Sequence, residues 1–424
     1  MSVYRAHFDV TESKLISIGD IALKSTLRFR KARNLADEQG QVFTPAVIAS
    51  LLAKAVAADR ETIVDIGAGE GALASAALTR CKDAAVVLVE KDKQYAQALS
   101  SLFTPNAKVI AEDALTPGLL ESIISPLAKS VVLSNPPYGM LRISREELTS
   151  DREELPPIVE GGGWVRRDAA FLARIWSASN KGTSLGLIVT SAIICDKAYE
   201  SYRRKLAEEL SDLVITELHP KTFANAEVQA YLISGCKSVR RKRNVLLRQA
   251  NLQGNIVNEL SVSTQQAIER LDYTYHSMIH EVQLKPGQSI GSLSELGGII
   301  ARGSRSQNVF RALGLTAFHT TDFVTNSKHL KLNGAIEGFK SAHPGDILIP
   351  RVGSRCLIRE AKVVEGTGLI TDCIYRIRAP QSVQKKIWHT LDSDFGREWR
   401  KLAAKGSCAK HITIETLSSL PILA

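Results

Sequence analysis

The sequence lacks the cysteine and histidine patterns that hold metals or form disulfide frameworks. Its 424 residues contain six cysteines, scattered singly, with no Cys-x-x-Cys pair and no histidine cluster beside them. We therefore expect neither a zinc site nor a set of disulfides. The chain also lacks the long apolar segment of a signal peptide, and no run approaches the roughly 20 apolar residues of a membrane span. A cytoplasmic protein without bound metal or membrane is the simplest interpretation.

The chain also has fewer acidic than basic residues, and it has no repeated sequence. The chain has 54 Lys and Arg against 44 Asp and Glu, a net charge of +10, and it contains no internal repeat or low-complexity tract. A basic balance favours an anionic partner, with nucleic acid the first candidate. The length exceeds that of one hydrophobic core, so we expect two domains.

Short apolar runs alternate with helix-compatible segments through the first half of the chain. The predicted strands are Thr62–Ile66, Ala84–Val89, Lys108–Asp113 and Val131–Leu133. Strands that alternate with helices predict a doubly wound α/β sheet. Upstream of them, Thr44 is predicted to cap a helix whose first residue is Pro45.

The pattern of apolar runs and the residue composition change partway along the chain. The basic run Arg240–Arg243 ends the alternating pattern, and short β-like runs separated by Gly, Pro, Ser and Asp begin near Gly287. From composition we predict a first domain over residues 1–240, a linker over 241–284 and a smaller, β-rich α+β domain over 285–424.

A glycine turn follows the first predicted strand, in the pattern Asp65-x-Gly67-x-Gly69-x-Gly71. Glycines without side chains let a ligand approach the backbone, and an acidic residue that ends the next strand, here Glu90, accepts hydrogen bonds from ribose hydroxyls. The two features predict an adenosine-containing cofactor. A dinucleotide-binding unit is the alternative, although its usual spacing is Gly-x-Gly-x-x-Gly.

The fourth predicted strand ends in Asn135-Pro136-Pro137-Tyr138. Two prolines cannot continue a central strand, and they stiffen the turn that follows it. Such a turn holds the Asn135 side chain and nearby carbonyls out as acceptors, beside the flat ring of Tyr138. It suits the binding of a planar amine, and an ordinary rigid turn is the plain alternative.

The order of these motifs resembles that of the gamma-class DNA adenine-N6 methyltransferases of restriction-modification systems, such as TaqI methyltransferase. The resemblance covers roughly residues 38–235 and implies a Rossmann-like, class I methyltransferase sheet that binds S-adenosyl-L-methionine. It implies that Phe43-Thr44-Pro45 contacts the methionine part of that cofactor, Glu90 its ribose and Asp113 its adenine amine. The full implied set of cofactor contacts is Phe43, Thr44, Pro45, Asp65, Gly67, Ala68, Gly69, Gly71, Glu90, Lys91, Asp113, Ala114 and Asn135.

The same resemblance implies that Asn135, Pro136, Pro137 and Tyr138 are the catalytic residues. A flipped-out adenine would stack on Tyr138 and Phe223, while the Asn135 side-chain oxygen and the Pro136 carbonyl accept its amine hydrogens. Direct transfer of this kind needs no covalent intermediate. Cytosine-C5 methyltransferases use a Cys that follows Pro, and this chain has no Pro-Cys dipeptide.

In the second predicted domain, the segments His343–Ser354, Lys410–Ile412 and Leu417–Ile422 resemble target-recognition domains and type I specificity subunits. This resemblance implies double-stranded DNA as a partner, and a restriction endonuclease encoded separately. Phosphate contacts are predicted for basic residues. These are Arg142, Arg145, Arg166, Arg167, Arg351 and the run Arg240–Arg243.

Three alternatives stay open at this point. The planar amine could belong to RNA adenine, to cytosine N4 or to a protein glutamine. The chain could also be a non-catalytic DNA-binding specificity subunit. Finally, Asp346 with Glu360-Ala-Lys362 imitates a nuclease carboxylate-Lys pattern, which would combine restriction and modification in one chain.

Overall fold

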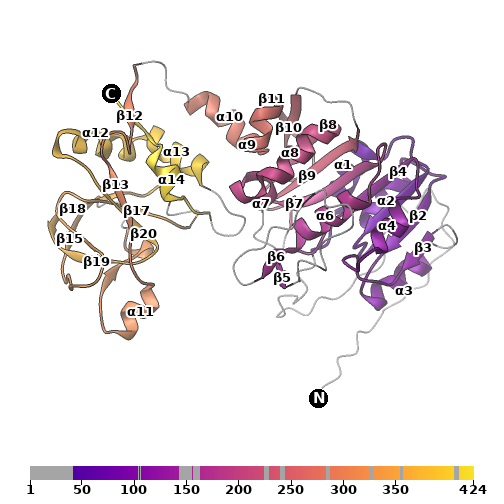
Figure 1. Ribbon diagram of the computed structural model, residues 1–424, viewed down its shortest axis with the longest axis horizontal. Coiled ribbons are helices and arrows are strands. Elements are labelled where there is room, and N and C mark those ends of the chain that lie inside the picture. Colours follow the sequence, from indigo (N-terminus) through magenta and orange to yellow (C-terminus); the bar gives the residue numbers. More distant parts are fainter. Residues whose placement is uncertain are drawn as a thin grey trace. The chain divides into compact units, whose positions relative to one another are not determined.

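The computed structural model describes residues 42–103, 105, 107–142, 155, 163–223, 229–238, 244–282, 287–323, 328–353, 357–404 and 410–424. The chain divides into two compact units, of which the first ends at Tyr273 and the second begins at Thr274. Each unit has its own sheets and its own hydrophobic core, and most of their elements are labelled in Figure 1.

The described part of the first unit forms a nine-stranded sheet in the order β11-β10-β8-β9-β7-β4-β1-β2-β3. Its strands are β1 (Thr62–Ile66), β2 (Ala85–Val89), β3 (Ala107–Ile110), β4 (Ser130–Ser134), β7 (Ser184–Thr190), β8 (Leu210–Glu217), β9 (Ala230–Lys237), β10 (Asn244–Ala250) and β11 (Ile256–Ser263). Within the run from β3 to β8, only β9 is antiparallel to its neighbours. The doubly wound, Rossmann-like fold class predicted from the sequence is therefore confirmed for the first unit.

Helices cover both faces of this sheet (Figure 1). One face packs against α1 (Ala46–Val56), α2 (Ala72–Leu78) and α3 (Lys93–Leu102), and the other against α4 (Leu119–Ile124), α6 (Arg167–Ala178) and α8 (Glu200–Glu209). Alternate residues of a strand point to opposite faces, so Ile63 belongs to the first core and Val64 to the second. A strand buried on both sides reads as one continuous apolar run, which explains why the central strands were predictable.

The predicted linker differs from the structure. Within residues 241–284, β10 pairs with β8 and β11 pairs with β10, so both belong to the first sheet. The helix α9 (Thr264–Glu269) then packs into the second core, the one that contains Val64. Composition gave no signal because β11 is an edge strand with mostly exposed residues, Asn258 and Glu259 among them.

The second unit is a mixture of short strands and helices. Its described residues form a five-stranded sheet in the order β13-β20-β17-β18-β15. These strands are β13 (Ile299–Arg302), β20 (Ile374–Arg378), β17 (Ile347–Pro350), β18 (Ala361–Gly366) and β15 (His329–Leu332). Smaller sheets pair β12 (Ser289–Ser292) with β21 (Pro421–Leu423), and β19 (Gly368–Ile370) with β14 (Ala317–Phe318) and β16 (Ser341–Ala342). The helices are α11 (Gln307–Ala312), α12 (Gln381–Asp392), α13 (Asp394–Ala403) and α14 (Ile414–Ser418), after α10 (Tyr273–Val282) at the boundary between the units. No helix in the described ranges is long and apolar enough to cross a membrane.

Candidate active site

A cavity of about 550 Å³ opens where the central strands of the first sheet end. Its lining comes from residues just after β1, β2, β3 and β4, at the point where the strand order reverses between β1 and β4. Ligands of doubly wound sheets bind at this switch point, and the volume is that of a small-molecule site. Of the residues predicted for the site, Phe43, Gly67, Gly69, Glu90, Lys91, Asp113, Ala114, Asn135, Pro137, Arg142 and Arg167 line the cavity. Those that do not are Thr44, Pro45, Asp65, Ala68, Gly71, Pro136, Tyr138, Arg166 and Phe223.

Two aromatic rings approach the glycine turn. A side chain at Gly67 would lie 3.6 Å from Phe171, and one at Gly69 would lie 3.8 Å from Phe43. Both rings also line the cavity, so the missing side chains leave room for a flat ligand against the backbone. Phe171 was not predicted from the sequence. It belongs to the first turns of α6, and no local motif distinguishes it from a core residue.

Glu90 closes the turn from the end of β2. Its Oε2 accepts a hydrogen bond from the Gly69 amide at 2.8 Å, and its Oε1 accepts one from the Asp92 amide at 2.9 Å. Burial raises the pKa of the Glu90 carboxyl, although the two backbone donors oppose that shift. A carboxylate has about four lone-pair sites, so acceptor capacity remains for ligand hydroxyls.

Asp113 is already hydrogen-bonded on both oxygens. Lys91 Nζ donates to Oδ2 at 2.7 Å, and the Leu115 amide donates to Oδ1 at 3.0 Å. Partial burial would raise the pKa of this carboxyl, but the bonds from Lys91 and Leu115 outweigh it and the pKa is lowered. Asp113 is therefore ionised at neutral pH and can accept a further amine hydrogen at the cavity wall.

Asp65 does not line the cavity, and its side chain bonds the helix that follows the glycine turn. Its Oδ2 accepts a hydrogen bond from the Ala74 amide at 3.0 Å, in the first turn of α2. Complete burial, with a smaller contribution from the charge of Glu90, raises the pKa of Asp65 to about 8. Asp65 thus ties the end of β1 to the start of the helix that follows the glycines.

Both polar atoms of the Asn135 side-chain amide are hydrogen-bonded within the protein. Its Nδ2 donates to the Val42 carbonyl at 2.8 Å and to Thr44 Oγ1 at 2.9 Å. Its Oδ1 accepts a hydrogen bond from the Tyr138 hydroxyl at 3.0 Å. The planar-amine acceptor predicted from the sequence is therefore occupied by a hydroxyl from the same turn.

Tyr138 and Phe223 meet edge to face. Their ring centroids are 6.3 Å apart with an interplanar angle of 81°, and both side chains are buried. In this conformation Tyr138 does not present an open face, so stacking of a base on it requires the ring to turn. Burial, together with the negative charge of Asp168, raises the pKa of Tyr138 far above its usual value, which keeps the hydroxyl protonated as a donor.

The predicted cap of the first helix is wrong. The N-cap of α1 is Pro45, without any side-chain cap, and the Pro45 carbonyl accepts from the Ile48 and Ala49 amides. Thr44 is thus one residue too early to cap this helix. Its hydroxyl instead accepts the bond from Asn135, 91 residues further along the chain.

Of the arginines predicted to contact DNA, Arg166 and Arg351 are hydrogen-bonded within the protein. Arg166 donates to the buried Asp168 and to Thr190, while Arg142 and Arg167 line the cavity. In the second unit, Arg351 Nε donates to the Asp372 carbonyl at 3.1 Å. Arg145 and the run Arg240–Arg243 lie outside the described residues.

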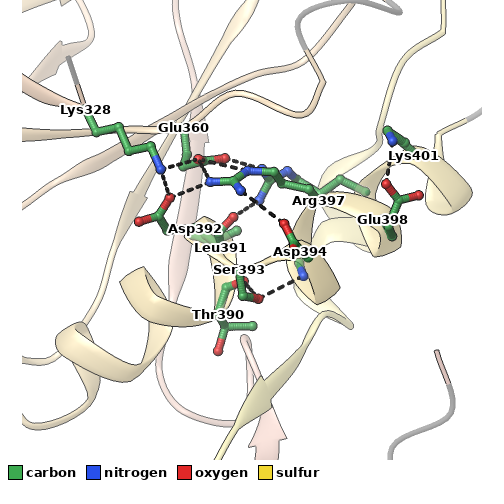
Figure 2. A network of polar contacts seen from close by, with 12 residues as sticks. Lys328, Glu360, Thr390, Leu391, Asp392, Ser393, Asp394, Arg397, Glu398 and Lys401 are labelled. Atoms are coloured by element: carbon green, nitrogen blue, oxygen red, sulfur yellow. Dashed lines mark hydrogen bonds and ion pairs between the residues drawn. The ribbon is translucent and has the colours of Figure 1, made fainter. Parts of the chain in front are cut away.

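The nuclease-like carboxylates of the second unit are bound to arginines. Asp346 accepts two hydrogen bonds from Arg378, at 2.8 and 2.7 Å. Glu360 accepts a hydrogen bond from Arg397 at 2.7 Å, within the network that Figure 2 shows. It also accepts one from the fully buried Arg400 at 2.5 Å. The described residues contain no group of three or more His, Cys, Asp or Glu that could hold a metal ion. Glu360 thus ties α13 to the start of β18, and Asp346 pairs with an arginine of β20, so both carboxylates have structural partners.

Comparisons with known proteins give one partial family match and several distant structural matches. A family model described as ribosomal RNA adenine dimethylase matches residues 34–144, from before α1 to just past the Asn135 turn. No protein of curated function matches the sequence.

Among solved structures, the type IIG restriction endonuclease BpuSI aligns with 92% of this chain at 11% identity and a TM-score of 0.49. A modification subunit of a type I restriction enzyme from Vibrio vulnificus aligns with 55% of the chain at 14% identity and a TM-score of 0.45. The type I methyltransferase subunit from Streptococcus thermophilus aligns with 54% at 18% identity and a TM-score of 0.42. The chain spans 59%, 57% and 52% of the lengths of these three proteins, respectively.

Proposed function

We propose that the first unit is an S-adenosylmethionine-dependent methyltransferase acting on the N6 amine of adenine in double-stranded DNA, as the modification enzyme of a restriction-modification system. The observation that carries the proposal is the position of Asn135. It directly follows β4 at the switch point and lines the same cavity as the glycine turn and Glu90. A cofactor cavity and a planar-amine acceptor thus share one wall.

The residues around the cavity fit the cofactor. Gly67 and Gly69 leave the backbone open between Phe43 and Phe171, where an adenine ring or a sulfonium chain can pack. Glu90 retains acceptor capacity for ribose hydroxyls, and Asp113 is an ionised acceptor for an adenine amine. When bound, the cofactor supplies the electrophilic methyl group.

The chain's own residues prepare the target amine. The lone pair of an exocyclic amine is delocalised into the ring, which makes it a poor nucleophile. Asn135 Oδ1 and the Pro136 carbonyl would accept its two hydrogens and favour the pyramidal, nucleophilic geometry. The amine would then replace the Tyr138 hydroxyl on Asn135 Oδ1, and the Tyr138 ring would turn to stack on the base, opposite or beside Phe223. Base stacking offsets part of the few kcal/mol that extrusion from the duplex costs.

The second unit is proposed as the DNA-recognition module. Residues 274–424 contain 20 Lys and Arg against 12 Asp and Glu, so they carry most of the net positive charge of the chain. Such an excess favours a polyanion, and its phosphate contacts would make binding strongly dependent on salt. A separately encoded endonuclease would cleave the same unmodified sequence.

The test combines purified protein, tritium-labelled S-adenosylmethionine and duplex plasmid DNA, followed by nucleoside analysis. We expect label in N6-methyladenine at one short sequence motif, located by base-resolved sequencing of DNA from expressing cells. Asn135→Ala should remove the label while cofactor affinity, measured by calorimetry, stays within about twofold. The control is Asn258→Ala, an exposed amide on β11 outside the site.

A second candidate substrate is adenine in ribosomal RNA, because the family model that matches residues 34–144 carries that description. The same assay with ribosomal RNA in place of plasmid separates the two. Label in RNA adenine and none in DNA would overturn the DNA proposal and leave the adenine-amine chemistry in place. Label in protein would overturn both.

A further inference from the structure

The segment Val42–Pro45 makes contacts that neither its position before α1 nor a role in cofactor binding explains. Pro45 caps α1 with its carbonyl, so Thr44 is not needed for the helix. Its hydroxyl and the Val42 carbonyl both accept hydrogen bonds from Asn135 Nδ2, at 2.9 and 2.8 Å. Phe43, between them, points to the glycine turn and contacts the Tyr95 ring at a centroid distance of 5.8 Å.

These two contacts decide which end of the Asn135 amide faces the target. A side-chain amide can in principle turn over and exchange its donor for its acceptor. A backbone carbonyl can only accept, so the Val42 carbonyl requires the nitrogen on its side. Oδ1 must then point the opposite way, where the Tyr138 hydroxyl donates to it. Thr44 fixes the second amide hydrogen and stops the group from rotating about its last bond.

We propose that Thr44 is a positioning residue for methyl transfer, which holds Asn135 with its oxygen directed at the target amine. The inference rests on the proposed function for its activity readout. It differs from the predicted role of Thr44 as a cofactor contact, since Thr44 does not line the cavity and its hydroxyl binds the Asn135 side chain. A misplaced or rotating acceptor lowers the rate of the chemical step more than it weakens binding.

The first test separates kcat from binding. Thr44→Val keeps the shape of the side chain and removes the acceptor, and we expect kcat at saturating substrates to fall about tenfold or more. Thr44→Ser retains the hydroxyl and should stay within about threefold of the wild type. Calorimetric affinity for S-adenosylmethionine should change less than twofold in both variants. The matched control is Thr79→Val, because the exposed Thr79 hydroxyl bonds only the local Ala76 carbonyl.

The second test does not depend on activity. In protein labelled with ¹⁵N-asparagine, the Asn135 side-chain amide, identified by its loss in Asn135→Ser, should exchange its hydrogens slowly. Exchange should become markedly faster in Thr44→Val and stay slow in Thr44→Ser. Thr44→Ala, which adds no bulk, replaces Thr44→Val if that variant does not fold.

An unchanged kcat in Thr44→Val and Thr44→Ala would overturn the inference, and so would a loss of activity that saturating cofactor restores. Rapid amide exchange at Asn135 in the wild type would also overturn it. If the wild type methylates no adenine, the proposed function fails, and the exchange rates alone then decide the role of Thr44.

Discussion

Single hydrogen bonds decide what the residues of this site can do. Asn135 Oδ1 is the acceptor on which the proposed chemistry depends, and in the structure it is bonded to the Tyr138 hydroxyl. A target amine must therefore compete with a group from the same turn. Competition within the protein lowers the apparent affinity for a flipped base, since the bond to Tyr138 is lost when the amine binds.

Tyr138→Phe removes the competing hydroxyl and keeps the ring. A net hydrogen bond is worth roughly 1 kcal/mol, so we expect the target base to be captured about twofold to tenfold more tightly. Fluorescence of 2-aminopurine at the target position measures this capture. Tyr138→Ala is the comparison variant: it loses the stacking surface, worth about 1–3 kcal/mol, and should bind the base more weakly. Weaker capture by the Phe variant would mean that the hydroxyl assists the base and does not compete with it.

Asp65 makes stability depend on pH. Its pKa is raised from 3.8 to about 8 by burial, so between pH 4 and pH 8 the unfolded chain loses its proton and the folded chain keeps it. The contribution of Asp65 to the free energy of unfolding is therefore fully present below pH 4 and is lost as the pH rises towards 8. The slope is up to about 1.4 kcal/mol per pH unit.

Asp65→Asn keeps an acceptor for the Ala74 amide and cannot titrate. Its free energy of unfolding relative to the wild type should therefore rise steadily between pH 5 and pH 8. Urea titrations of both proteins at three pH values measure the difference, from which the other titrating groups cancel. Parallel curves for the two proteins would show that Asp65 is ionised in the fold.

The sequence predicted the acidic and glycine residues of the cavity wall better than their aromatic and hydroxyl partners. Gly67, Gly69 and Glu90 stand next to strand ends, and strand ends are visible as the limits of apolar runs. Phe171 reaches the glycine turn from a helix about 100 residues later, and one phenylalanine in an apolar helix carries no mark of that contact. Thr44 was assigned to the nearest helix, because a hydroxyl has no local sign that it binds a distant amide.

At the scale of elements, Gly71 joins the glycine turn to α2. It is the N-cap of that helix with φ of +76°, and a side chain there would lie 2.7 Å from Phe103 and 2.9 Å from Leu99 on the α3 side. Gly118 is also an N-cap with φ of +76°, before α4, but it has no atom within 4 Å of the same position. The two glycines share the backbone conformation and differ in packing.

Gly71→Ala should therefore cost more than Gly118→Ala. The left-handed backbone costs roughly 1–2 kcal/mol at both positions, and overpacking against Phe103 adds about 1–3 kcal/mol at Gly71 alone. Only Gly71→Ala should also weaken S-adenosylmethionine binding, because it displaces the turn that lines the cavity. Chemical denaturation and calorimetry measure the two effects. Equal losses of stability in the two variants would show that the Phe103 and Leu99 side chains move aside without a measurable energetic cost.

Elements buried on two faces were predicted and elements at the edge were not. β1, β2 and β4 each contain a run of buried apolar residues because helices cover both sides, and these runs are plain in the sequence. β11 shows only one fully buried residue, so its sequence resembles that of a linker. The error in the domain boundary follows from this difference in burial.

At the scale of the whole molecule, each unit has its own core, and the second unit also contains a buried polar network. In the second unit, Glu360 has a side-chain exposure of 2% and pairs with Arg400, whose side chain is fully buried. Arg400 also donates to the Leu357 carbonyl at 3.0 Å and the Leu391 carbonyl at 2.8 Å. Removing one partner of a buried pair leaves the other charge without compensation.

Arg400→Met should thus destabilise the second unit by about 3 kcal/mol, because Glu360 stays buried with fewer partners. The neighbouring Lys401 supplies the matched control, because it pairs with Glu398 on the same helix (Figure 2) and both side chains are exposed to solvent by more than a third. Lys401→Met should therefore change the free energy of unfolding by less than about 0.5 kcal/mol. Scanning calorimetry with and without S-adenosylmethionine assigns each melting transition to a unit, because the ligand raises only the melting temperature of the unit that binds it. We expect Arg400→Met to lower the transition that the cofactor does not shift, and to leave the cofactor affinity of the first unit unchanged. A variant that loses both transitions together would instead require the two units to unfold as one.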